Sequence, residues 1–260
     1  MEGLSGTKRD NRETGVFTNR IRSDSRVAEH IHRFMAGDRF QSSSETWRHD
    51  LRERLSHHTG ISEDYLQICS GFNRAISSIV RAFCRPGDNA IVCGPADNDM
   101  ESRLEEFGLK VLSYPGRTPF TADADGILGL ISKKTKLIYL EQPNSITGTV
   151  YSRFEIEMIL NNSRDVFLVL NESFYEYFRA DAAGLVASYD NLIIIRSIGT
   201  TRDMDIPCLD YILASHRTKS QLEKFIGYGS SEMKKSISVA KIFNSASEKF
   251  CQSDIVSDAM

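Results

Sequence analysis

The sequence predicts a three-layer α/β/α domain built on a mostly parallel β-sheet. From residue 89 onward, short strand patterns alternate with helical patterns, and the strands are apolar on both faces. Strands without a polar face are typical of a parallel sheet that helices cover on both sides. A length of 260 residues is enough for one substantial domain of this kind.

The region before residue 89 predicts a flexible arm followed by three helices. Residues 1–24 are rich in charge, Ser, Thr and Gly and lack periodicity, which indicates the arm. Apolar residues then recur at helical spacing in three segments, and Gly60 is placed to end the second helix. The periodic residues are Val27, Ile31 and Phe34, then Trp47, Leu51 and Leu55, then Ala75, Ile76, Ile79, Val80 and Phe83.

The central region predicts six strands and two intervening helices. The strands are Asn89–Cys93, Lys110–Ser113, Leu137–Leu140, Val166–Leu170, Leu192–Ile195 and Tyr211–Ala214. The first helix carries Met100, Leu104 and Phe107 and is followed by Gly108 as its stop. The second helix begins with a capping box from Ser152 to Glu155.

The C-terminal region predicts two more helices. One follows Lys219 through Leu222 and Phe225, and glycines at 227 and 229 interrupt the chain after it. The last helix has an apolar stripe that either forms an interface or folds back on its own domain. The stripe consists of Val239, Ile242, Phe243, Ala246 and Phe250. These patterns divide the chain into an arm (1–24), a large domain (25–229) and a C-terminal helix and tail (230–260).

Composition excludes several classes of function. A net charge of -3 gives no basic face for nucleic acid, and no apolar run is long enough to span a membrane. Five cysteines without CxxC spacing indicate a reduced, cytoplasmic protein rather than a disulfide framework or zinc site. The pair His57 and His58 has no spaced partner, so no metal site is expected.

One segment carries a resemblance to a known family. Residues 196–214 read RSIGTTRDMDIPCLDYILA. They resemble the segment RTFSKAFGLAGLRIGYLIA of fold-type I pyridoxal-phosphate (PLP) aminotransferases, closest to the histidinol-phosphate aminotransferases, and the two align without a gap. The lysine that forms the Schiff base with PLP falls on Thr200, and the arginine that binds the cofactor phosphate falls on Cys208.

Four further segments resemble motifs of the same family, in the family's order and spacing. Residues 69–76 resemble the family motif NGSDEAI, and residues 92–97 resemble VPEPTY. Residues 139–149 resemble NPNNPTGT, and residues 167–174 resemble VVVDEAY. The resemblance extends from about Phe17 to Lys241. It implies the large domain of a PLP-dependent transferase, truncated so that the small C-terminal domain is missing.

The resemblance also implies a degenerate cofactor pocket. Ser145 replaces the asparagine that binds the phenolic oxygen of PLP, Asn171 replaces the aspartate that keeps the pyridine nitrogen protonated, and Asp97 replaces the aromatic ring that stacks on the pyridine. In the family, backbone amides of the turn at residues 69–76 bind the cofactor phosphate. The predicted pocket positions are Ser70, Gly71, Phe72, Asp97, Ser145, Asn171, Phe174, Gly199, Thr200 and Cys208.

These replacements predict a catalytically inactive aminotransferase homologue with a binding, scaffolding or regulatory role. No catalytic residue and no cofactor are expected, because Thr200 has no amine for a Schiff base. The resemblance implies a homodimer or a heterodimer with an aminotransferase-type paralogue. One alternative is an aminotransferase class I/II-like enzyme with residual or altered PLP binding that acts on an amino acid or amino-sugar type substrate. A third hypothesis keeps the pocket for another small ligand, held by Ser70, Asp97, Ser145, Asn171 and Thr200.

Overall fold

The structure, a computed structural model, describes residues 52–53, 55–57, 59–69, 71–95, 98–116, 122–175, 181–198 and 209–226. Within these residues the chain forms a seven-stranded sheet. In chain order the strands are β1 (Leu66–Cys69), β2 (Asn89–Cys93), β3 (Lys110–Tyr114), β4 (Thr135–Glu141), β5 (Phe167–Asn171), β6 (Leu192–Ile198) and β7 (Leu209–Ala214). All six predicted strands are present, and β1 is an additional one.

The sheet is mixed but mostly parallel, with the strand order β1-β7-β6-β5-β4-β2-β3. Four neighbouring pairs are parallel, whereas β7 runs antiparallel to both β6 and β1. The chain passes from β2 to β3 on one side and later places β4 on the other side of β2. In parallel α/β sheets, ligands bind outside the carboxyl ends of strands at such a reversal of strand order.

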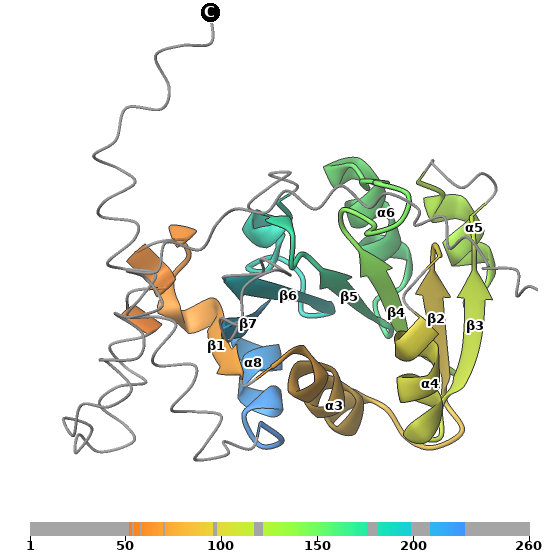
Figure 1. The fold of residues 1–260 in the computed structure, drawn as a ribbon, viewed down its shortest axis with the longest axis horizontal. Helices are drawn as coiled ribbons and strands as arrows, with labels where there is room; N and C mark the ends of the chain where they lie inside the picture. Colours follow the sequence, from red (N-terminus) through yellow and green to blue (C-terminus); the bar gives the residue numbers. More distant parts are fainter. Residues whose placement is uncertain are drawn as a thin grey trace, which may run out of the picture.

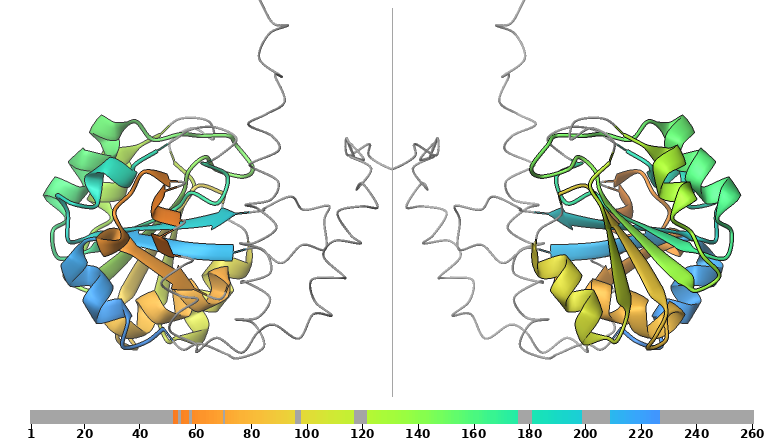
Figure 2. Two further views of the ribbon diagram at one scale, coloured as in Figure 1. Left: turned by 90° about the vertical axis from the view of Figure 1, so that its left-hand side faces the viewer. Right: turned by 90° about the vertical axis from the view of Figure 1, so that its right-hand side faces the viewer.

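Helices cover both faces of the sheet (Figures 1 and 2). On one face lie α3 (Phe72–Phe83), α4 (Asn98–Glu106) and α8 (His216–Leu222), and on the other α5 (Ala124–Gly129), α6 (Arg153–Asn162) and the short 3-10 helix η2 (Ala183–Leu185). A second 3-10 helix, η1 (Glu63–Tyr65), precedes β1. The predicted three-layer α/β/α fold is therefore confirmed.

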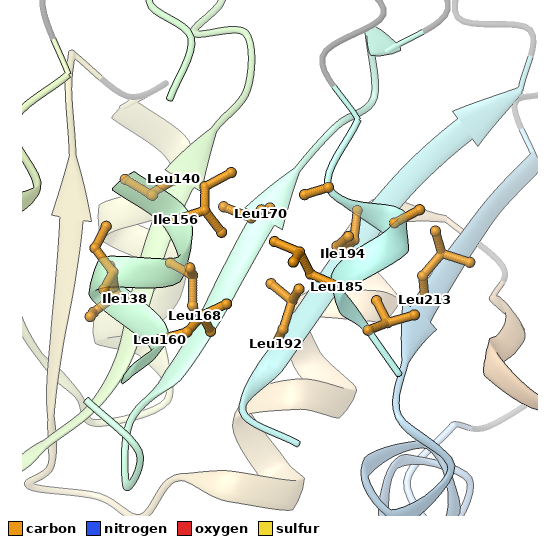
Figure 3. Close-up of a cluster of buried hydrophobic side chains, with 14 of the residues drawn as sticks. Ile138, Leu140, Ile156, Leu160, Leu168, Leu170, Leu185, Leu192, Ile194 and Leu213 are labelled. Carbon is orange, nitrogen blue, oxygen red and sulfur yellow. The ribbon is translucent and has the colours of Figure 1, made fainter. Parts of the chain in front are cut away.

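Apolar side chains fill both spaces between the sheet and the helices. On the α6 face, Ile156 and Leu160 of the helix face Ile138 and Leu168 of the strands, and all four are buried (Figure 3). A second buried cluster joins α3, α4 and α8 to the opposite face. The inner strands are apolar on both faces because both faces are core, whereas the edge strand β3 is largely exposed.

Local sequence signals correspond closely to the helix ends. The Ser152 hydroxyl accepts a hydrogen bond from the N–H of Glu155, and the Glu155 carboxylate accepts one from the N–H of Ser152, which confirms the capping box. Gly60 follows the last helical residue of its segment with φ 69°, as expected for a helix stop. The prediction of a helix after Lys219 is wrong in its bounds. That helix, α8, begins at His216 because the Ser215 hydroxyl caps it by accepting from Thr218 N–H.

Several predicted features lie outside the described residues. They are the arm at 1–24, the helix at 27–34, Trp47 and Leu51 of the second helix, the glycine break at 227–229, the stripe at 239–250, and both predicted domain boundaries. Among the described helices, none is both long and apolar enough to cross a membrane.

Candidate functional site

A cavity of about 370 Å³ lies at the carboxyl ends of β4, β5 and β6, beside the first turn of α3 and one side of α4. Its position next to the reversal of strand order is the usual ligand site of a sheet of this topology. The described residues that line it are Phe72, Asn73, Asp99, Met100, Arg103, Tyr139, Glu141, Ser145, Asn171, Ser173, Phe174, Ser197 and Asp210.

Strand register brings these side chains together. Glu141 and Asn171 are the last residues of β4 and β5 and lie side by side, and Ser197 near the end of β6 pairs with Asp210. Because β7 is antiparallel to β6, its first residues reach the same edge where the parallel strands end. Residues far apart in sequence therefore share one edge of the sheet.

Asn171 is held in a fixed orientation by both ends of its amide. Its Nδ2 donates to the hydroxyl of Tyr139 at 2.9 Å, and its Oδ1 accepts from the N–H and hydroxyl of Ser173 at 3.1 and 2.6 Å. The side chain is uncharged, so it offers the cavity hydrogen bonds but no charge.

Glu141 places a buried carboxylate at the cavity. One oxygen accepts from the hydroxyl of Tyr139 at 3.4 Å, and the other accepts from the N–H and hydroxyl of Ser145 at 3.2 and 2.8 Å. Ser145 is thus oriented by Glu141.

The turn that carries Ser145 is fixed by Asn144. Its Oδ1 accepts from the N–H groups of Ile146 and Thr147 at 3.1 and 2.9 Å. The turn also approaches the end of β2 closely: a Cβ at Gly94, whose φ is +81°, would lie 2.9 Å from Asn144 Nδ2. Only glycine tolerates both that backbone conformation and that contact.

Asp210 is a second buried carboxylate in the cavity. It accepts hydrogen bonds from the hydroxyl of Ser197 and from the backbone N–H of Phe72, the first residue of α3. Burial raises the pKa of Asp210, and these two hydrogen bonds oppose that rise. With Asp99 and Glu141, Asp210 makes three carboxylates against one described guanidinium, Arg103.

A buried ion pair between Arg196 and Glu172 lies next to the cavity-lining ends of β5 and β6. Arg196 Nε and Nη2 donate to Glu172 Oε2 at 2.9 and 2.7 Å, and the guanidinium carbon lies 3.8 Å from the Tyr175 ring centre. Nη2 also donates to Asp181 at 2.5 Å. Glu172 and Arg196 precede the cavity-lining Ser173 and Ser197 by one residue each, so the pair fixes the ends of β5 and β6.

The predicted pocket positions divide into two groups. Phe72, Ser145, Asn171 and Phe174 line the cavity, and Gly71 is the N-cap of α3. Ser70, Asp97, Gly199, Thr200 and Cys208 lie outside the described residues. The described part of the chain contains no group of three metal-ligating side chains that could hold an ion.

The two buried carboxylates, Glu141 and Asp210, were not among the predicted site residues. The sequence holds a signal for Asp210, because the similar aminotransferase segment has glycine at the aligned position. Local patterns do not show that β7 runs antiparallel to β6, which brings Asp210 to the cavity.

The comparisons with known proteins agree with this architecture. The family "Aminotransferase class I and II" matches residues 17–252. The chain belongs to that family.

The chain is 30% identical over 148 residues to histidinol-phosphate aminotransferase of Dehalococcoides mccartyi, and the match covers 57% of this chain and 41% of that protein. It is also 30% identical over 179 residues to the Bacillus subtilis enzyme of the same name, covering 66% of this chain and 49% of that protein. The chain thus spans about half, or less than half, of the length of these curated relatives.

Solved structures support the same fold. Histidinol-phosphate aminotransferase from Sinorhizobium meliloti, in complex with pyridoxal-5'-phosphate, superposes with a TM-score of 0.71 at 20% identity, covering 86% of this chain and 62% of that chain. L-threonine-O-3-phosphate decarboxylase from Porphyromonas gingivalis gives 0.65 at 17% identity, covering 85% and 66%. At these identities the likeness establishes the aminotransferase large-domain fold alone.

Proposed function

We propose that this family member is a catalytically inactive aminotransferase homologue with a binding, scaffolding or regulatory role. The observation that carries the proposal is the uncharged amide of Asn171 at the carboxyl end of β5. The family resemblance places there a carboxylate that keeps the PLP pyridine nitrogen protonated. Both ends of the Asn171 amide are engaged by Tyr139 and Ser173. Without a charge partner, the pyridine ring of PLP would be a poor electron sink.

Two further features support the proposal. No lysine is among the described residues that line the cavity, and the sequence has Thr200 where the Schiff-base lysine aligns. The phosphate end of PLP would also meet the buried carboxylate of Asp210 and lack the arginine that aligns with Cys208. Each charged hydrogen bond lost is worth about 1.5–3 kcal/mol. Affinity for PLP should therefore be about millimolar or weaker.

The absorbance spectrum of the purified chain with added PLP tests this proposal. We expect no aldimine band and, after borohydride reduction, no PLP–lysine adduct in the mass spectrum. The variant Thr200→Lys should also fail to transfer amino groups, because Asn171 and Cys208 remain. An active histidinol-phosphate aminotransferase treated identically serves as the positive control. A stoichiometric adduct on any lysine, or transamination by Thr200→Lys, would contradict the proposal.

We further propose that the binding role involves a second aminotransferase-like chain, as a homodimer or with a paralogue. The family resemblance supports this, and so do three exposed apolar side chains in and after the turn that carries Ser145: Ile146, Val150 and Phe154. Exposed apolar patches on a folded domain often mark interfaces. Sedimentation velocity at micromolar concentration should give the mass of a dimer. A strict monomer that also stays unassociated when mixed with a purified aminotransferase-type paralogue would rule the dimer out.

A further inference from the structure

The N-terminus of α3 lies at the cavity. The helix has 12 residues, and its N-cap Gly71 has φ 103° and no side chain that could cap it. The first N–H groups of a helix have no partners within the helix and lie at the positive end of its dipole. Such an end attracts a phosphate, a sulfate or a carboxylate.

In this chain a carboxylate of the protein itself already lies there. Asp210, at the start of β7, pairs with Cys69 at the end of β1 and with Ser197 on β6, so it sits beside the turn that leads into α3. The N–H of Phe72 and the hydroxyl of Ser197 both donate to its carboxylate. Asp210 is 4% exposed, and its position is fixed by two strands.

The same donors cannot serve a ligand anion at the same time. A phosphate group that approached Phe72 N–H and Ser197 would have to displace the Asp210 carboxylate or lie against it. A phosphate in contact with the Asp210 carboxylate would be repelled strongly, because water is largely excluded there. Asp99 and Glu141 add negative charge to the same cavity.

We propose that Asp210 is a built-in anion that occupies the anion position at the N-terminus of α3 and excludes phosphate-bearing ligands from the cavity. The inference rests on the proposed function, because it concerns what the cavity binds in a chain that does not use PLP. The cavity is then selective for small molecules without a phosphate group. The glycine that the aligned family segment has at this position carries no side chain and would leave both donors open.

Removing the carboxylate should open a phosphate site. Asp210→Gly and Asp210→Ala are compared with the wild-type chain, with inorganic phosphate as the probe and chloride at matched ionic strength. Phosphate should raise the melting temperature of both variants and leave that of the wild type unchanged. The dissociation constant for phosphate, from ³¹P NMR titration, should be at least about tenfold lower in each variant than in the wild type, a difference of about 1.4 kcal/mol. Adding Ser197→Ala to Asp210→Ala should reverse part of this gain.

Asp99→Ala is the matched control, because it removes another carboxylate from the same cavity but leaves the α3 terminus occupied. An equal gain in phosphate affinity for Asp99→Ala would overturn the inference, since it would reduce the role of Asp210 to overall charge. An unchanged affinity in folded Asp210 variants would overturn it too.

The wild-type chain supplies a readout that does not depend on the variants folding. Its Phe72 amide resonance should not move when phosphate is added, and a saturable shift would overturn the inference. This outcome is distinct from failure of the proposed function. The latter is seen as a PLP adduct on lysine, whereas inorganic phosphate forms no such adduct.

Discussion

Replacing Arg196 with methionine is expected to lower the free energy of unfolding by about 3–5 kcal/mol. Arg196 is 1% exposed and Glu172 is fully buried. Removing the guanidinium leaves the Glu172 carboxylate in the core with the N–H of Ala182 as its remaining described donor. The cost arises because the buried Glu172 must either stay charged without its partner or take up a proton. Urea denaturation followed by circular dichroism measures it.

Arg217→Met is the matched control, because it removes an arginine from an exposed ion pair. Arg217 and Asp190 are 76% and 55% exposed and 3.5 Å apart, so this loss should stay below about 1 kcal/mol. Combining Arg196→Met with Glu172→Gln should recover part of the larger loss, because the second change removes the unpaired charge. Equal losses for Arg196→Met and Arg217→Met would refute the assignment of the buried pair as a stabilising contact.

The cost of Arg196→Met should also depend on pH. Burial raises the pKa of Glu172 from 4.5 to about 7 even though Arg196 opposes the rise. A carboxyl group with a raised folded-state pKa contributes stability that is present at low pH and is lost as pH rises through that pKa. Without Arg196 the pKa rises further, so the loss continues to higher pH. The difference between wild type and variant should therefore be larger about one unit above pH 7 than one unit below it.

Leu168→Ala is expected to cost about 2–5 kcal/mol, because it leaves a cavity in the centre of the core. Leu168 is fully buried on the middle strand β5 and belongs to the cluster beneath α6 (Figure 3). Neighbouring strands on both sides limit how far the core can collapse around the missing atoms. Thermal and urea denaturation should both report the loss.

Leu112→Ala provides the same chemical change at the edge of the sheet. Leu112 lies on the edge strand β3 and is 37% exposed, so the truncation opens little space in the core. Its cost should be clearly smaller than that of Leu168→Ala. Equal losses of unfolding free energy for Leu168→Ala and Leu112→Ala would contradict the conclusion that burial beneath α6 stabilises the fold.

The sequence by itself determined the strands and helices that form the core. The predicted strand from Asn89 to Cys93 has the same bounds as β2. A short apolar run between turns is typical of a strand that is buried on both faces. The capping box at Ser152 was equally readable, since its hydrogen bonds join residues three apart. The weak elements were missed: β1 has only four residues and includes the buried Gln67, and α5 has six residues.

Only the tertiary structure decided what the cavity contains. Sequence comparison placed Asn171 and Ser145 at the site, because they lie in segments that resemble family motifs. It did not reveal that Glu141 binds Ser145, or that Asp210 reaches the first turn of α3. The register of β1 with β7 depends on contacts between residues more than a hundred positions apart. Local residue patterns do not encode such pairings. They arise from burying both faces of the sheet at once.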